Sequence, residues 1–150
     1  MSAKVFVDTN VLVYKRDASE PEKQGAAAAW MAILWERRAG RLSYQVLQEF
    51  YVTVTTKLSP GMDRDAARRN IQALLSWKPL PINSSVLMGA WHFQDRYRLS
   101  FWDALIASAA QAMGCRYLLS EDFQAGLEMG ELTVVNPFQT QPFELGDEMK

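Results

Sequence analysis

Apolar and polar positions alternate along the chain in blocks that predict strands and helices following one another. Short apolar runs are typical of buried strands, whereas an apolar residue at roughly every third or fourth position is typical of a helix. We predict strands at 4–8, 41–44, 80–82, 116–119 and 132–135. We predict helices at 21–40, 45–58, 63–77, 84–98 and 100–114. Because strands alternate with helices, the expected fold class is α/β, a three-layer α/β/α domain with a central parallel sheet.

The segment 45–58 carries two conflicting signals. Its many β-branched residues favour a strand on propensity alone. As a helix, the segment would place several apolar side chains on one face, and the sequence SPG at 59–61 would end it. We therefore predict a helix, with an apolar face made of Val46, Leu47, Phe50, Val54 and Leu58.

The predicted helix 21–40 has an unusually wide apolar sector. Trp30 and Leu34 lie on its apolar face, and Ile33 and Trp35 flank that face on either side. Two interpretations are open. The whole sector belongs to the core, or part of it forms a groove or a dimer surface, because exposed aromatic patches mark interfaces.

The composition is that of an ordinary globular protein, and it also limits the cellular compartments in which the protein is expected. Hydrophobic residues make up 49% and charged residues 22% of the 150 positions, and no run is long enough for a transmembrane span or a signal peptide. The single cysteine, Cys115, cannot form an intramolecular disulfide, which favours a reducing compartment. We expect a cytoplasmic protein with no membrane contact, one domain at 1–138 and a polar, loosely ordered tail at 139–150.

Four acidic residues occupy positions from which they could meet in space. Asp8 and Asp122 come at or just after the ends of predicted strands, and Asp103 is in the first turn of a predicted helix. Glu49 lies on a helix and points away from its apolar face. In parallel sheets the ligand site lies at the carboxyl ends of the strands. Four converging carboxylates repel one another unless protons or divalent cations neutralise them, and hard oxygen ligands suit Mg²⁺ or Mn²⁺.

Each of these acids also has an ordinary explanation when it is taken alone. Asp8 and Asp122 can cap the turns that follow them, and Asp103 completes a capping-box-like pattern with Ser100. Glu49 can be a solvated helical residue. The combination of the four, rather than any one of them, points to a metal-dependent site for phosphodiester hydrolysis.

Four segments around these acids resemble, in order, the motifs of the PIN-domain nucleases, and most specifically the toxin branch called VapC-like. They are residues 7–12 (VDTNVL), 47–51 (LQEFY), 99–106 (LSFWDALI) and 118–123 (LLSEDF). The first motif alone is weak and the third is fairly specific. All four in order span nearly the whole predicted domain.

The resemblance implies a PIN fold and a Mg²⁺- or Mn²⁺-dependent endoribonuclease that hydrolyses single-stranded RNA and leaves 5′-phosphate and 3′-hydroxyl ends. It implies a cognate antitoxin that blocks the site, and a homodimer. A housekeeping PIN nuclease and a non-catalytic binding module are the alternatives. The implied catalytic and metal-binding residues are Asp8, Glu49, Asp103 and Asp122, and the implied supporting residues are Thr9, Asn10 and Ser120.

A few other polar residues are weaker candidates for a role. Lys15 and Arg16 follow Asp8 closely and are candidates for contacts with RNA phosphates, although ordinary solvated positions are the simpler explanation. Glu121 precedes Asp122 and either faces solvent, which we favour, or lends its carboxylate to a metal. His92, on a polar helix face, and Cys115 carry no predicted catalytic role.

Overall fold

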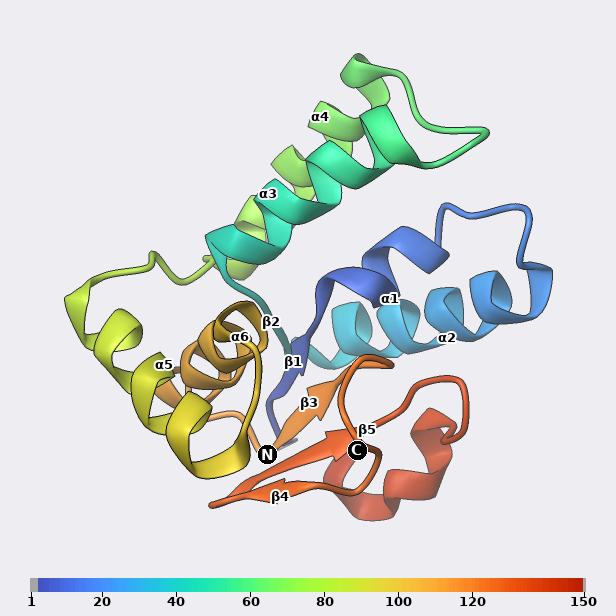
Figure 1. Ribbon diagram of the computed structural model, residues 1–150. Helices are drawn as coiled ribbons and strands as arrows, with labels where there is room; N and C mark the ends of the chain where they lie inside the picture. Colours follow the sequence, from blue (N-terminus) through green and yellow to red (C-terminus); the bar gives the residue numbers. More distant parts are fainter. Residues whose placement is uncertain (1–2, 150) are drawn as a thin grey trace.

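The computed structural model describes residues 3–149 and shows an α/β fold in which helices cover both faces of one sheet (Figure 1). The strands are β1 (Val5–Val7), β2 (Gly40–Arg41), β3 (Tyr117–Leu119), β4 (Glu128–Met129) and β5 (Leu132–Val135). The α-helices are α1 (Thr9–Tyr14), α2 (Pro21–Arg37), α3 (Tyr44–Val52), α4 (Arg64–Leu74), α5 (Ser84–Tyr97) and α6 (Phe101–Ala112). A π-helical segment η1 (Thr53–Lys57) and the 3-10 segments η2 (Leu75–Trp77) and η3 (Pro142–Met149) complete the chain.

The sheet is parallel except at one edge. Its strand order is β2-β1-β3-β5-β4, and only the β4–β5 pair in the described sheet is antiparallel. The register pairs Val5 of β1 with Gly40 of β2 on one side and with Tyr117 of β3 on the other. The predicted parallel sheet is therefore confirmed for β2, β1, β3 and β5. Because these strands are parallel, the residues that follow β1 and β3 emerge at the same edge.

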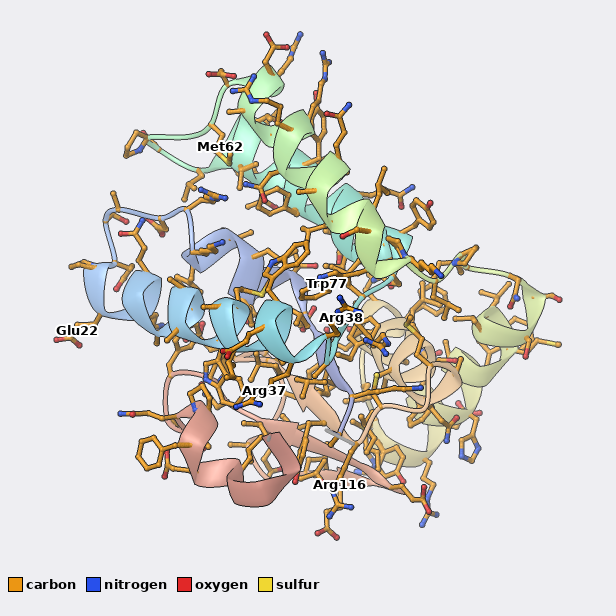
Figure 2. All side chains as sticks on the ribbon, turned by 180° about the vertical axis from the view of Figure 1, so that it is seen from behind. Glu22, Arg37, Arg38, Met62, Trp77 and Arg116 are labelled. Atoms are coloured by element: carbon orange, nitrogen blue, oxygen red, sulfur yellow. The ribbon has the colours of Figure 1, made fainter. Side chains whose placement is uncertain are left out.

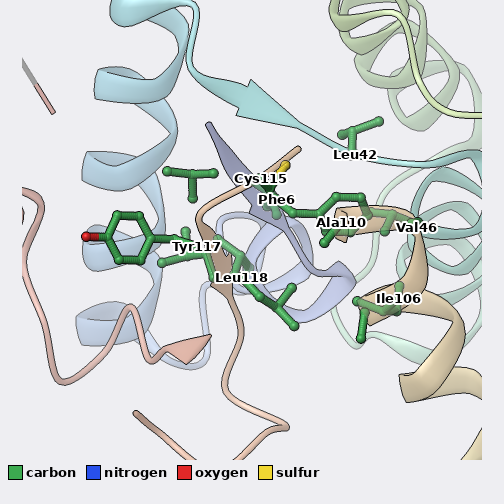
Figure 3. Packing of buried hydrophobic residues seen from close by; sticks show 14 of the residues in the cluster. Phe6, Leu42, Val46, Ile106, Ala110, Cys115, Tyr117 and Leu118 are labelled. Atoms are coloured by element: carbon green, nitrogen blue, oxygen red, sulfur yellow. The ribbon is translucent and has the colours of Figure 1, made fainter. Parts of the chain in front are cut away.

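Two helical layers bury the sheet. Helices α1 and α2 lie on one side of it, and α5 and α6 lie on the other (Figure 1). Phe6 of β1, Leu118 of β3 and Ile106 and Ala110 of α6 are all buried in one core cluster, which Figure 3 shows from close by. The central strands are buried along their whole length, as expected for strands with helices on both faces.

Side-chain caps fix where three of the helices begin. Asp63 accepts a hydrogen bond from Ala66 N (2.7 Å), Asn83 from Val86 N (3.0 Å) and Ser100 from Asp103 N (3.1 Å). Each of these bonds satisfies a backbone donor that has no partner inside the helix. The cap at residue 100 matters most for function, because it sets the orientation of the first turn that carries Asp103.

The predicted helix at 45–58 is present, but its second half is wider than an α-helix. It runs as α3 to Val52 and continues as the π-helical turn η1. Thr55 Oγ1 donates to the carbonyl of Tyr51 (2.7 Å) and Thr56 Oγ1 to that of Val52 (2.5 Å). These hydroxyls compete with backbone N–H groups for the carbonyls one turn earlier, which loosens the regular ladder. The β-branched residues thus alter the helix without converting it to a strand.

Two other local predictions need correction. The strand predicted at 80–82 is reduced to a single bridge between Ser43 and Leu80, since the flanking prolines limit backbone pairing. Strand β4 was not predicted, because two residues give no periodic signal.

The C-terminal segment, expected to be loosely ordered, forms the 3-10 turns of η3, which contact α2. Trp30 Nε1 ties the chain before it by donating to the carbonyls of Pro137 (3.2 Å) and Thr140 (3.0 Å). A buried indole on α2 therefore orders the start of this segment, a long-range contact that local composition does not reveal. In the described part of the chain, no helix has the length and apolar character needed to cross a membrane.

Candidate active site

Asp8 sits at the point where β1 ends and α1 begins. Its backbone N–H donates to Leu119 O of β3 (3.0 Å), and its Oδ1 accepts from Thr9 N (2.7 Å) as the cap of α1. Only 4% of the residue is exposed. A buried strand followed directly by a capped helix leaves this side chain little freedom, so its carboxylate is held at the carboxyl edge of the sheet.

The loop after β3 brings Asp122 to the same place. Ser120 Oγ donates to Asp8 Oδ2 (2.7 Å) and accepts from Asp122 N (3.1 Å). Asn10 Nδ2 lies 3.4 Å from Asp8 Oδ2 and 3.1 Å from Asp122 Oδ2, so one amide group faces both carboxylates. Asn10 Oδ1 in turn accepts from Glu121 N (3.2 Å). Asn10 and Ser120 therefore join the ends of β1 and β3 through side chains.

Helices α3 and α6 supply the other two acids. Glu49 of α3 accepts from Thr9 Oγ1 (2.9 Å), which links α3 to the start of α1. Asp103 lies in the first turn of α6, and its backbone N–H is held by Ser100 Oγ. Both residues are half-buried. The polar residues Thr9, Asn10 and Ser120 thus contact the predicted acids or the loop that carries them.

The four acids line one cleft of about 370 Å³ between α1, α3 and α6. The four acids therefore meet in space as predicted, and their catalytic and metal-binding roles stay predictions. Several other lining residues had not been predicted, among them Asp17, Gln45 and Trp102.

Burial and mutual repulsion make the cleft a poor place for uncompensated negative charge. Burial raises the pKa of Asp8 to about 7; the bonds from Ser120 and Thr9 oppose this shift, and the charges of Asp122 and Glu49 add to it. The pKa of Glu49 is raised by burial and, less strongly, by the neighbouring acids Asp103 and Asp122. The pKa of Asp103 is raised by burial and by Asp122. The carboxylates therefore interact with one another electrostatically.

The cleft fits a divalent cation as a counterion. Among the described residues that line it, none is a lysine, an arginine or a histidine, so no side chain there neutralises the acids. Within the described residues, no group of three or more acidic, cysteine or histidine side chains is arranged so that it could hold a metal ion by itself. Mg²⁺ suits such an open arrangement, because it is commonly held by one or two carboxylates and keeps several of its waters. Such an ion would take one or two ligands from among Asp8, Glu49, Asp103 and Asp122, and waters would supply the rest.

Some of the unpredicted cleft residues carried signals that could have revealed them. Gln45 lies four residues before Glu49 and so shares its helical face, and its Nε2 donates to Trp102 O (3.2 Å). Trp102 directly precedes Asp103, and 61% of it is exposed. Asp17 is buried in a polar loop and accepts from Ser19 N (3.0 Å). No periodic pattern marks that position, so the sequence offered no comparable signal for Asp17.

The remaining candidates lie outside the cleft. Lys15 and Arg16 are not among its lining residues. Lys15 is partly buried, which lowers its pKa, and the Arg16 guanidinium contacts the side-chain amide of Asn70 on α4. Glu121 neither lines the cleft nor faces bulk solvent freely, since it forms an ion pair with Lys23 of α2 (2.5 Å). The predicted RNA contacts of Lys15 and Arg16 stay predictions.

Solved structures with a similar fold come from bacterial toxin–antitoxin systems. A toxin–antitoxin complex from Klebsiella pneumoniae matches with a TM-score of 0.63 and 19% identity, covering 89% of this chain and 98% of that one. VapC20 of Mycobacterium tuberculosis, a toxin that cleaves the sarcin–ricin loop, matches with a TM-score of 0.60 and 20% identity, covering 79% and 90%. VapBC2 of Rickettsia felis, bound to a DNA fragment from its promoter, matches with a TM-score of 0.58 and 15% identity, covering 87% and 96%. At these identities the likeness concerns the fold.

Sequence comparison identifies the family. No curated protein sequence matches this chain. The family model of the PIN domain does match it, over residues 5–125, a range that contains β1, β3 and the four predicted acids. Because this match covers most of the 150 residues, the chain belongs to the PIN domain family.

Proposed function

We propose that this protein is a metal-dependent endoribonuclease that hydrolyses single-stranded RNA. The observation that carries the proposal is the convergence of Asp8, Glu49, Asp103 and Asp122 in one cleft with no basic side chain among its described lining residues. A protein that only binds a partner has no need to maintain four mutually repelling carboxylates. Membership of the PIN family supports the same reading.

In this proposal the four acids have different roles, because their side chains are held with different rigidity. Asp8 is the fixed point, because Thr9 N, Ser120 Oγ and Asn10 Nδ2 all approach its carboxylate. Glu49, Asp103 and Asp122 are more exposed and can adjust to a ligand. Trp102 lies at the cleft with most of its indole exposed, where a nucleotide base can stack on it.

Mg²⁺ or Mn²⁺ would be held by these carboxylates and, when bound, would activate a water molecule and neutralise charge on the scissile phosphate. The carboxylates themselves would hold the cation in place, and the raised pKa values of three of them favour binding of a positive charge. Asp8, Glu49 and Asp103, whose pKa values are raised, are suited to sharing the cleft with a cation that compensates their charge.

We further propose that the protein is the toxin of a toxin–antitoxin pair and acts as a homodimer. The proposal is supported by the fold it shares with VapC20 of M. tuberculosis and with the toxin–antitoxin complexes of K. pneumoniae and R. felis. The partner would be a small antitoxin that covers the cleft. Expression should arrest growth, and a gene adjacent to this one should relieve the arrest. Normal growth on expression of the active enzyme would favour an RNA-processing role instead.

The direct test is RNA cleavage by the purified protein. The wild type with Mg²⁺ or Mn²⁺ should cut single-stranded RNA to 5′-phosphate and 3′-hydroxyl ends, and EDTA should stop the reaction. Asp103→Asn should lower the rate by more than about a hundredfold, because it removes a charged cation ligand. Asp95→Asn, which neutralises an exposed acid on α5, is the matched control and should cut at the wild-type rate. Undiminished cleavage by Asp103→Asn, or cleavage in EDTA, would contradict the proposal.

A further inference from the structure

The edge of the sheet opposite the acidic cleft carries basic residues. Lys4 precedes β1, Arg41 is in β2 and Arg116 precedes β3. We call this side, where the three parallel strands begin, the amino edge. The carboxyl ends of β1 and β3 lead instead to Asp8 and Asp122. Because the strands are parallel, basic residues gather at the edge where they begin and acidic residues at the edge where they end.

A pocket of about 530 Å³ lies at the amino edge beside β2. It is formed where α2, the η2 turn and α6 end and where β2 begins. Figure 2 shows Arg38 and Trp77 next to each other at this place. Its lining combines two indoles with three basic side chains and contains no acid among the described residues. The lining includes Trp35, Trp77, Arg38, Arg41, Lys78 and Gly40.

The indoles of Trp35 and Trp77 pack against each other and form one aromatic wall of the pocket. The ring centroids of Trp35 and Trp77 are 5.1 Å apart, with an interplanar angle of 57°. The Trp77 ring lies so close to the backbone of Gly40 that any Cβ at position 40 would overlap it. Trp35 remains 39% exposed. A side chain seated on a glycine, with an exposed partner beside it, offers a flat apolar face to a ligand.

The three cations are held near this wall without a neutralising partner. Arg41 Nη1 donates to the carbonyls of Gly40 (2.8 Å) and Arg38 (3.1 Å), which fixes its guanidinium. Arg38 and Lys78 end their helical segments in the left-handed conformation, both with φ of 55°. Within the described residues, none of the three forms an ion pair with an acid. Cations at helix ends offset the helix dipole, but this role requires no aromatic wall beside them.

We propose that this pocket binds a segment of single-stranded RNA, with a base against Trp35 and Trp77 and phosphates on Arg38, Arg41 and Lys78. The proposal rests on the ribonuclease function proposed above and adds a second RNA contact, away from the cleft. Flat rings flanked by cations are the combination by which proteins hold single strands without reading their sequence. An acidic protein segment would use the cations but has no requirement for a pair of indoles, one of them exposed.

RNA binding by a cleavage-deficient protein tests the cationic half of the pocket. In an Asp103→Asn background, Arg38→Glu with Lys78→Glu should weaken binding of a labelled 30-nucleotide RNA by about tenfold or more at low salt. The slope of log affinity against log salt should fall by about 1.4, the value for two lost phosphate contacts on a single strand. The matched control is Arg64→Glu with Arg69→Glu, which makes the same charge change on exposed positions of α4.

A second variant tests the aromatic half independently of charge. Trp35→Leu keeps an apolar side chain but removes the stacking surface, and should weaken RNA binding by about tenfold. Its thermal midpoint is measured in parallel, and its affinity is read only under conditions where the protein is folded. Polyglutamate is the competitor: it should displace RNA poorly. Efficient displacement by polyglutamate, with unchanged RNA affinity in Trp35→Leu, would assign the pocket to an acidic protein segment and overturn the proposal.

Cleavage assays separate failure of this proposal from failure of the ribonuclease function. The Arg38→Glu, Lys78→Glu variant should cut a short oligonucleotide at the wild-type rate and show a raised KM only for long RNA. If the wild type cuts RNA and this variant has unchanged KM and affinity for long RNA, the pocket proposal is wrong while the function stands. If the wild type cuts no RNA with either metal, the proposed ribonuclease function is wrong, and the pocket proposal, which rests on it, is wrong as well.

Discussion

The two edges of the central sheet differ in charge and in how their side chains are held. At the carboxyl edge, Asp8 is fixed by Thr9, Asn10 and Ser120 and is almost fully buried. At the amino edge, Arg38 and Lys78 are exposed at helix ends. The first arrangement concentrates charge that a bound cation can relieve, whereas the second leaves charge available to a large anion.

The difference between the edges also explains why net charge was uninformative. The chain carries a formal net charge of −1, which suggests no attraction to nucleic acid. That sum hides an acidic cleft and a basic pocket on opposite sides of the same three strands. Charge separated in this way produces local fields that a whole-chain total cancels.

The largest effect on stability is expected from neutralising Asp8, the buried carboxylate at the carboxyl edge. Without metal, Asp8→Asn should raise the free energy of unfolding by about 1–3 kcal/mol at pH 8. The pKa of Asp8 rises from its ordinary value of 3.8 to about 7 on folding, so the stability that protonated Asp8 contributes is present below pH 4 and is lost as the pH rises through 7. The variant's advantage should therefore disappear below pH 4.

Urea unfolding in EDTA, from below pH 4 up to pH 8, measures this effect, and a parallel series without EDTA tests added metal. Asp95→Asn serves as the exposed control and should show no such pH dependence. Mg²⁺ or Mn²⁺ should stabilise the wild type and leave Asp8→Asn nearly unchanged. An Asp8→Asn variant that is less stable than the wild type at pH 8 would mean that the carboxylate is well compensated without a cation, and the contrast between the edges would weaken.

A smaller effect is expected from removing the hydrogen bond between the two strand ends. Ser120→Ala deletes the donor to Asp8 Oδ2 and should cost about 1–2 kcal/mol of stability at pH 8. The cost should shrink at pH 4, because a bond to an ionised acceptor is stronger than one to a neutral acceptor. Ser108→Ala is the control, since buried Ser108 donates to the neutral carbonyl of Val86 (2.8 Å). Equal pH dependence in the two variants would show that Ser120 does not act through the charge of Asp8.

The smallest expected effect concerns the amino edge. Gly40→Ala should displace the Trp77 indole, lowering stability by about 1 kcal/mol and RNA affinity several-fold. Gly25→Ala is the control, because a Cβ at position 25 meets no atom within 4 Å and alanine favours the helix. Denaturant unfolding and RNA binding are measured on both. Unchanged RNA affinity in folded Gly40→Ala would show that the position of Trp77 does not matter to the ligand.

Local patterns in the sequence were enough to predict most of the elements. Apolar runs and helical periodicity predicted four of the five strands in part and the helices from α2 to α6. An element that faces the core must carry apolar residues at regular intervals, and this pattern is visible in the sequence. They failed where no period exists, as in the two-residue strand β4. They also failed at the tail, where a contact from Trp30 to Thr140 decides the conformation.

The sequence by itself determined the fold class and the identity of the four acids, because strand ends, helix starts and ordered motifs are local properties. Tertiary structure alone decided that Asp17, Gln45 and Trp102 share the cleft and that Glu121 pairs with Lys23. It also decided that Trp35 lies beside Trp77 in a basic pocket. The physical reason is that contacts between distant segments depend on how the layers pack and on strand order, and neither leaves a periodic signal in the residues that make the contact.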